Sequence, residues 1–435
     1  MDISIGFWLL CLFLVLIALS VPIAIAIALS SLVIMAFIMP FDAAVITAGQ
    51  KLITGIDSFS LLAIPFFILA GNIMNRGGIA TRLINLAKLL AGGLPGSLAQ
   101  VNILSNMMFG AVSGSAVAAA AAVGKTLGPQ MKDEGYDENY STAVNVASCP
   151  AGLLIPPSNS LIVFSVVSGG TSVAALFIAG YLPGILMGLS CMVVAYIIAR
   201  RRGYTNTSST RLTMRQKLTV VWQAVPSLGL IVVVIGGIIG GVFTATEGAC
   251  IAVLYALILA LAYRAISIRD LKDISIETTV ITGIMLFLIG ASTIMSWAMA
   301  FTGLPDLIST WMLSISENPV VILILMNIIL MIVGMFMDLT PALLIFTPIF
   351  MPIATELGMH PIHFAMMIIF NLCIGIATPP VGTALFVGCS VSGARIEEVV
   401  KAILPFCAVL IVALMLVTFI PAISLFLPGL FGLIN

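Results

Sequence analysis

The stretch that decides the fold is GIATPPVGTALF (375–386), which stands between the apolar runs MMIIFNLC and VGCSVSG. Its neighbours are apolar enough for a membrane helix, but adjacent prolines and nearby glycines disfavour a helix interior. In lipid, an unpaired carbonyl group is so costly that a broken helix persists only where protein or a water-filled cavity receives it. The stretch therefore predicts a membrane helix that is broken at a functional position.

The composition of the whole chain supports this interpretation. Of 435 residues, 61% are hydrophobic and 8% are charged, whereas about a quarter of the residues of a soluble protein are charged. We expect an all-α polytopic membrane protein whose N-terminal run (1–22) is a first span rather than a signal peptide. The zero net charge excludes a nucleic-acid partner. The seven cysteines form no CxxC pair, and we expect them to be small core residues.

Runs of about 20 apolar residues predict ten spans. These lie at 3–20, 22–40, 57–75, 141–165, 173–199, 219–242, 245–263, 277–299, 363–390 and 401–427. Two further stretches, 97–130 and 319–355, are interrupted by polar residues, and we interpret them as re-entrant hairpins. With both termini outside, every Lys and Arg except Lys51 falls on the cytoplasmic side, as the positive-inside rule requires. Amphipathic arm helices are expected at 77–93 and 303–319.

The two halves of the chain share landmarks at a nearly constant offset. Pro95 and Gly110 match Pro319 and Gly334 at 224 residues, and Pro129, Gly135 and Pro156-Pro157 match Pro352, Gly358 and Pro379-Pro380 at 223. Each half has an odd number of spans, so the second is inserted upside down. This pattern predicts two inverted five-span repeats (1–199 and 218–435) of the kind found in secondary transporters. The basic linker (200–217) joins the two repeats. Either this is its only function, or it also contacts anionic lipid.

Each hairpin tip (110–116 and 334–341) is expected to face the broken helix of its own half (148–160 and 375–383). Freed carbonyl groups at such breaks can bind Na⁺, and freed amides can bind an anion. Side-chain oxygens at these positions come from Ser113, Ser115, Ser158, Asn159, Asp338, Thr340, Thr378 and Thr383. The alternative is that these small residues only let helices pack closely.

Two acidic residues stand out. Asp338 lies in an apolar stretch. Three alternatives are open for it: it coordinates Na⁺, it carries a proton, or it faces the water outside the membrane and does neither. Glu247, near the start of the seventh span, has either a coupling role or a structural one. Lys125, near the base of the first hairpin, is the only Lys or Arg inside the predicted transport core.

Five ordered motifs carry a family resemblance. IPFFILAGNIM (64–74), GAVSGSAVAAAAAVG (110–124), LLIPPSNS (153–160), GVFTATEGA (241–249) and ATPPVG (377–382) resemble the large membrane subunit of tripartite ATP-independent periplasmic (TRAP) transporters. Thr244-Ala-Thr-Glu247 departs from the family's Thr-Pro-Thr-Glu but keeps the glutamate. The stretch 150–172 is most similar to sialic-acid members.

The resemblance implies Na⁺-coupled uptake of an organic acid across a bacterial inner membrane by an elevator mechanism. Sialic acid is favoured as the substrate, and C4-dicarboxylates come next. The implied partners are a periplasmic substrate-binding protein and a small four-helix membrane subunit on a separate chain. No cofactor is implied beyond Na⁺ as the coupling ion.

The resemblance also implies where the ions and the substrate bind. One Na⁺ would lie among Ser113, Ser115 and Pro156, and another among Asp338, Thr378, Gly382 and Thr383. The substrate would lie between them, held by Ser115, Ser158, Asn159, Thr340 and Thr383. The main alternative is a self-sufficient Na⁺/dicarboxylate or citrate symporter without a binding protein. An enzyme is disfavoured, because the only histidines, His360 and His363, form no nucleophile–base pair.

Overall fold

The protein is described by a computed structural model that covers residues 3–204, 213–316 and 318–434. Within these ranges every regular element is a helix, which confirms the predicted all-α class. Eight of these helices are long and apolar enough to cross a membrane, and one bent pair would make a ninth. The centre of the predicted linker (200–217) lies outside the described residues.

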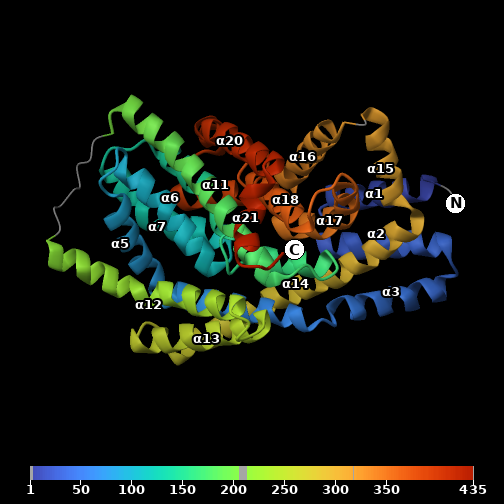
Figure 1. The fold of residues 1–435 in the computed structure, drawn as a ribbon, viewed down its shortest axis with the longest axis horizontal. Coiled ribbons are helices and arrows are strands. Elements are labelled where there is room, and N and C mark those ends of the chain that lie inside the picture. The colour runs from blue at the N-terminus through green and yellow to red at the C-terminus, as the bar shows by residue number, and fades with distance from the viewer. Residues whose placement is uncertain (1–2, 205–212, 317, 435) are drawn as a thin grey trace.

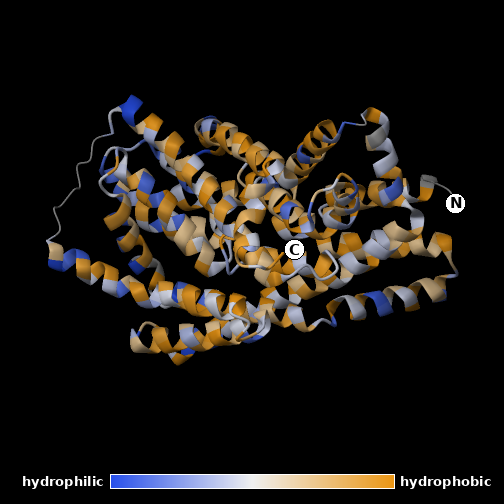
Figure 2. Ribbon diagram, in the orientation of Figure 1, coloured by the Kyte–Doolittle hydropathy of each residue, from blue (hydrophilic) through white to orange (hydrophobic). Residues whose placement is uncertain are grey.

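One group of helices comes from the beginning of each half of the chain (Figure 1). The long helix α14 (Ile268–Thr302) packs against α2, α3 and α4. The other members are α1 (Ile3–Ala18), α2 (Ile23–Ile38), α3 (Phe41–Ile56), η1 (Phe59–Leu62), α4 (Ala63–Arg76), α12 (Met214–Ile239) and α13 (Ala245–Ala262). Hydrophobic residues, drawn orange in Figure 2, are frequent along α12 and α13. Apolar side chains such as Val232 and Leu254 remain exposed on these helices, and we call this set the outer group.

A second group holds the hairpins and the broken helices, and we call it the hairpin group. Hairpin 1 is α6 (Ser97–Ser113) with α7 (Ala116–Asp133), and hairpin 2 is α16 (Pro319–Phe336) with α17 (Leu339–Glu356). The broken helices are α8 (Glu138–Ser148), α9 (Ala151–Leu154) and α10 (Asn159–Val167), then α18 (Pro361–Gly375) and α19 (Thr383–Ser392). The group also contains α11 (Val173–Arg202), α20 (Ile396–Phe419) and α21 (Pro421–Leu430).

Both predicted breaks are present. The first broken helix bends by 51° between Leu154 and Asn159, and the second is interrupted from Ile376 to Gly382. Helices also form where the arms are predicted, as α5 (Ile79–Ala91) and α15 (Leu304–Ile315). Each arm contacts both groups, α5 through α12 and α6, and α15 through α14 and α17.

The order of the helices repeats along the chain. The starts of α7, α8 and α11 precede those of α17, α18 and α20 by 223 residues each. The inverted placement of the two halves across a membrane stays a prediction.

Pairs of glycines let the hairpins cross the broken helices at very short range. A Cβ atom built on Gly152 would lie 2.3 Å from the Cα atom of Gly110, so α9 meets α6 backbone to backbone. The second half contains the same contact, because a Cβ atom on Gly375 would lie 2.6 Å from the Cα atom of Gly334. Only glycine fits at such crossings, and small residues are the usual means of close helix contact in membranes.

The helices α16 and α17, predicted as a re-entrant hairpin, are each long and apolar enough to cross a membrane. Three further differences from the predicted spans concern α3, α14 and α21. Helix α3 (Phe41–Ile56) was not predicted, because Asp42, Gln50 and Lys51 interrupt its apolar pattern. The predicted span 277–299 is part of the longer α14, which begins at a capping box formed by Ser267 and Asp270. The predicted span 401–427 ends at Phe419. Pro421 begins the separate helix α21, where its missing N–H group costs no hydrogen bond within the helix.

Candidate functional site

The two hairpin tips line one cavity of about 600 Å³, which we call the central cavity. Hairpin 1 contributes the run Ser113 to Ala116, and hairpin 2 contributes the run Asp338 to Thr340. Asn159 and Ser160, at the start of α10, complete the side formed by the hairpin group. Helices α4 and α14 of the outer group form the opposite side. The cavity therefore lies where the two helix groups meet.

Local sequence shapes the tip of hairpin 1. Gly114 ends α6 in the left-handed conformation at φ 64°, which glycine adopts without strain. The Ser115 hydroxyl accepts a hydrogen bond from the Ala118 amide at 3.2 Å and caps α7. Asn159 lies directly opposite, since a Cβ atom on Gly114 would be 3.2 Å from its side-chain nitrogen. The tip thus faces the broken helix of its own half.

The side-chain oxygen of Asn159 has no hydrogen-bond partner among the described residues. Asn159 is buried, and its Oδ1 atom accepts no hydrogen bond from any described residue. Buried polar atoms in native proteins nearly always have a partner. An unpartnered oxygen that lines a cavity is therefore a candidate ligand for a cation or for a donor on a bound molecule.

Two hydrogen bonds tie the tip of hairpin 2 to the second broken helix. The Thr383 hydroxyl donates to Oδ1 of Asp338 at 3.3 Å. The Gly382 amide donates to the Met335 carbonyl at 3.1 Å, with Gly382 in the left-handed region at φ 54°. The Asp338 carboxylate is accessible from the central cavity, and half-buried Thr340 lies beside it.

Other predicted site residues lie behind the cavity lining. The Ser158 hydroxyl is buried and donates to the Leu153 carbonyl. The Thr378 hydroxyl donates to the Ile374 carbonyl at 2.6 Å. The Ser158 hydroxyl thus supplies a partner to a carbonyl group at the first break, whereas the Ile374 carbonyl also accepts from the Ala377 amide at 3.1 Å. Pro156, Gly382 and Thr383 belong to the breaks but are not among the residues that line the cavity.

Glu247 lies apart from the central cavity, at the start of α13. Its carboxylate accepts hydrogen bonds from the Thr244 amide at 2.7 Å and from the Thr244 hydroxyl at 3.0 Å. Its own amide donates to the Thr244 hydroxyl at 3.3 Å. This is a capping box, which satisfies backbone donors at a helix start. The contacts show that Glu247 caps α13, and a coupling function stays a prediction.

Sequence reasoning missed several polar residues of the cavity. Asn72 and Asn75 on α4 and Glu277 on α14 line it, together with Lys125 on α7, which the sequence already places in the transport core. Asn72 donates to the Thr278 hydroxyl at 3.0 Å and so links α4 to α14. The signal was present, because asparagines three residues apart in an otherwise apolar span indicate a function there.

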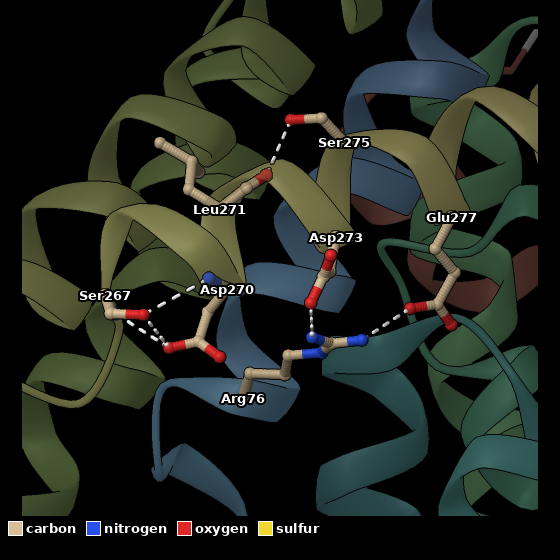
Figure 3. Close-up of polar contacts among 7 residues, drawn as sticks. All are labelled: Arg76, Ser267, Asp270, Leu271, Asp273, Ser275 and Glu277. Atoms are coloured by element: carbon tan, nitrogen blue, oxygen red, sulfur yellow. Dashed lines mark hydrogen bonds and ion pairs between the residues drawn. The ribbon is translucent and has the colours of Figure 1, made fainter.

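An ion-pair cluster lies next to the cavity (Figure 3). The Arg76 guanidinium, at the end of α4, contacts Glu277 at 3.2 Å and Asp273 at 3.9 Å, both on α14. These side chains are 40% to 62% exposed, so solvent screens the pairs and their stabilisation is modest. The cluster leaves the carboxylate of Glu277 already paired where it borders the cavity.

A multi-span helical protein with two hairpins and two broken helices around one cavity has the architecture of a membrane transporter. The sequence model of one family matches residues 10–423, and its description is "Tripartite ATP-independent periplasmic transporter, DctM component". The chain belongs to this family. It is a large permease subunit in a multi-pass inner-membrane transporter and not an enzyme.

Three relatives cover most of the chain. An uncharacterised protein, YgiK, from Salmonella typhimurium is 55% identical over 93% of this chain and 92% of its own. The sialic acid TRAP transporter large permease SiaM of Vibrio cholerae is 37% identical over 88% of this chain and 90% of its own. The C4-dicarboxylate TRAP transporter large permease DctM of Pseudomonas aeruginosa is 37% identical over 88% and 89%, respectively.

A solved structure shares the fold. The YdaH transporter of Alcanivorax borkumensis superposes with a TM-score of 0.62 over 86% of this chain and 88% of its own, at 14% identity.

TRAP permeases work with a small membrane subunit and a periplasmic binding protein, so this subunit takes part in binding-protein-dependent uptake.

Proposed function

We propose that this permease performs Na⁺-coupled uptake of an organic acid that a periplasmic binding protein delivers. The observation that carries the proposal is the convergence of both hairpin tips and the start of α10 on one cavity. In secondary transporters, substrate and coupling ions bind where paired broken helices meet. A separate four-helix membrane subunit completes the carrier, and both termini lie on the periplasmic side.

The ion sites follow from the oxygens at the two tips. Ser113, Ser115 and the free Oδ1 of Asn159 are available at hairpin 1. Asp338 supplies a carboxylate at hairpin 2, with the Thr383 hydroxyl 3.3 Å away. A carboxylate that lines a membrane cavity is costly unless a cation or a proton compensates its charge. Na⁺ at each tip would join the hairpin to its broken helix and complete the substrate site between them.

The substrate proposed first is sialic acid. The central cavity of about 600 Å³ falls within the usual volume range for small-molecule sites. A cavity of this volume can hold a sugar acid such as sialic acid. The Vibrio cholerae permease is named for sialic acid, and the Pseudomonas aeruginosa permease is named for C4-dicarboxylate. Both are 37% identical to this chain. C4-dicarboxylates are therefore the second choice.

The arrangement of the two helix groups supports an elevator mechanism. The ion-binding tips belong to the hairpin group, whereas Asn72 and Glu277 on the facing side belong to the outer group. Sliding of the hairpin group along α4 and α14 would carry the cavity across the membrane. The arm helices α5 and α15, which contact both groups, would link the moving part to the fixed one.

Uptake into proteoliposomes tests the proposal. The vesicles contain this chain with its small subunit, and labelled sialic acid or succinate is supplied with and without an inward Na⁺ gradient. Each condition is repeated with and without the matching binding protein. Uptake that requires both Na⁺ and the binding protein is the expected result. Na⁺-driven uptake by this chain alone would instead identify a self-sufficient symporter.

A further inference from the structure

A second cavity, of about 300 Å³, adjoins the central one, and we call it the side cavity. It lies between α7, α8 and α19, all of them in the hairpin group. Lys125 lines both cavities. Lys125 therefore lies where the two cavities adjoin.

Lys125 is the cation of this region that has no partner. The other lysine of the side cavity, Lys132, lies 3.4 Å from Glu138 and is paired with it. The Lys125 side chain forms no ion pair or hydrogen bond with any residue in the described ranges. The Lys125 side chain is exposed, and an ammonium group without a carboxylate partner can form a charge-assisted hydrogen bond with an anion that enters the cavity.

Ser141 also lines the side cavity, and its hydroxyl is a second polar group without a partner among the described residues. Its side chain is 8% exposed, and its Oγ atom has no hydrogen-bond partner among the described residues. Its polar neighbours are already engaged, because the Thr142 hydroxyl donates to the Glu138 carbonyl and the Asn145 amide donates to the Ala120 carbonyl, each at 2.8 Å. A buried hydroxyl left without a partner at a cavity wall indicates a missing ligand.

We propose that Lys125 and Ser141 form a second carboxylate-binding site, in which the substrate is held after it leaves the hairpin tips. The site lies on the cytoplasmic side, because Lys125, Lys132 and Arg76 belong to the basic clusters that the positive-inside rule places there. The inference rests on the proposed function, which supplies both the substrate class and this orientation. It adds an exit position for the substrate that is separate from the ion sites.

The kinetic test compares affinities on the two sides of the membrane. Lys125→Gln is expected to raise the half-saturating concentration of cytoplasmic-side substrate in exchange assays about tenfold, because one charge-assisted hydrogen bond is lost. Lys125→Arg keeps the charge and should stay within about twofold of wild type. The half-saturating Na⁺ concentration should be unchanged in both variants. Lys51→Gln, a lysine outside both cavities, is the matched control.

A labelling assay tests the site without transport. Ser141→Cys is treated with a small thiol reagent in detergent, with wild type as the background for the native cysteines. Sialic acid or succinate should slow the labelling, and Lys125→Gln in the same background should abolish that protection. Absent labelling, or labelling that neither anion slows, would overturn the proposal.

The two proposals fail differently. Anion protection of Ser141→Cys, together with no Na⁺-driven uptake by the wild-type protein, would contradict the proposed function and leave the carboxylate site standing. Na⁺-driven uptake with identical cytoplasmic-side affinity in wild type and Lys125→Gln would contradict the carboxylate site alone.

Discussion

Thr383 donates a hydrogen bond to Asp338 at 3.3 Å, and this contact joins the second broken helix to the tip of hairpin 2. The two residues are 45 positions apart in sequence. They meet because Gly382 turns the chain with a left-handed φ of 54° and donates its amide to Met335 on the same tip. The contact therefore links the carboxylate at the tip of hairpin 2 to the start of α19.

Asp338→Asn tests the part of the carboxylate in Na⁺ binding. The amide keeps the size and can still accept from Thr383, but it removes the charge that a cation would require. We expect the half-saturating Na⁺ concentration for uptake to rise about tenfold or more, with assembly onto the small subunit unchanged. Thr383→Val, which removes only the neutral donor, should have a smaller effect. Uptake with a wild-type Na⁺ response in Asp338→Asn would remove this residue from the ion site.

Gly375→Ala tests the close crossing of α18 and α16. The added Cβ atom would lie 2.6 Å from the Cα atom of Gly334, so the backbones must separate. Overpacking of this kind costs about 1–3 kcal/mol, and we expect a lower thermal unfolding temperature. Gly283→Ala on α14 is the matched control, because no atom lies within 4 Å of its new Cβ. Equal unfolding temperatures for the two variants would argue against the crossing.

Asn371→Ala tests a buried polar link in the same half. The Asn371 amide donates to the Asn327 carbonyl at 2.8 Å and to the Asn327 Oδ1 atom at 2.9 Å, with both residues buried. Removal of one partner leaves the other unsatisfied, which costs about 1–3 kcal/mol. Reduced thermal stability with an unchanged half-saturating Na⁺ concentration is expected. A stability equal to wild type would show that the link contributes nothing measurable.

Much of the fold could be predicted, because proline and glycine residues mark both helix breaks in the sequence. Pro379-Pro380 and Gly382 in an apolar run cannot continue a helix, and their counterparts Pro156-Pro157 mark the first break. Helix α3 could not be predicted from hydropathy, because Asp42, Gln50 and Lys51 dilute its apolar pattern below that of a span. A hydropathy window cannot recognise an amphipathic helix of this kind.

The sequence predicted the cavity residues at the hairpin tips, but it did not predict those that the outer group contributes on the opposite side. Ser113, Ser115, Asp338 and Thr340 line the cavity, and each lies at a turn that the sequence marks with glycine or proline nearby. Ser158 and Thr378 have the same chemistry, but their hydroxyls are used by Leu153 and Ile374. Asn72 and Glu277 come from a different helix group, and only tertiary packing brings them to the cavity.

Glu247→Ala separates the two functions that sequence left open for this residue. The side chain is exposed and caps α13 through Thr244, away from the central cavity. We expect a modestly lower unfolding temperature because the capping box is lost, with the Na⁺ dependence of uptake unchanged. A shifted half-saturating Na⁺ concentration in this variant would give Glu247 a coupling function instead.

Equilibrium binding of radioactive sodium to the purified permease, with and without sialic acid or succinate, tests the central claim most directly. Saturable Na⁺ binding that the substrate strengthens, and that Asp338→Asn and Ser113→Ala each weaken, is the result predicted by ion sites at the two hairpin tips. Wild-type protein that binds no Na⁺, or binding that neither substitution changes, would contradict those sites.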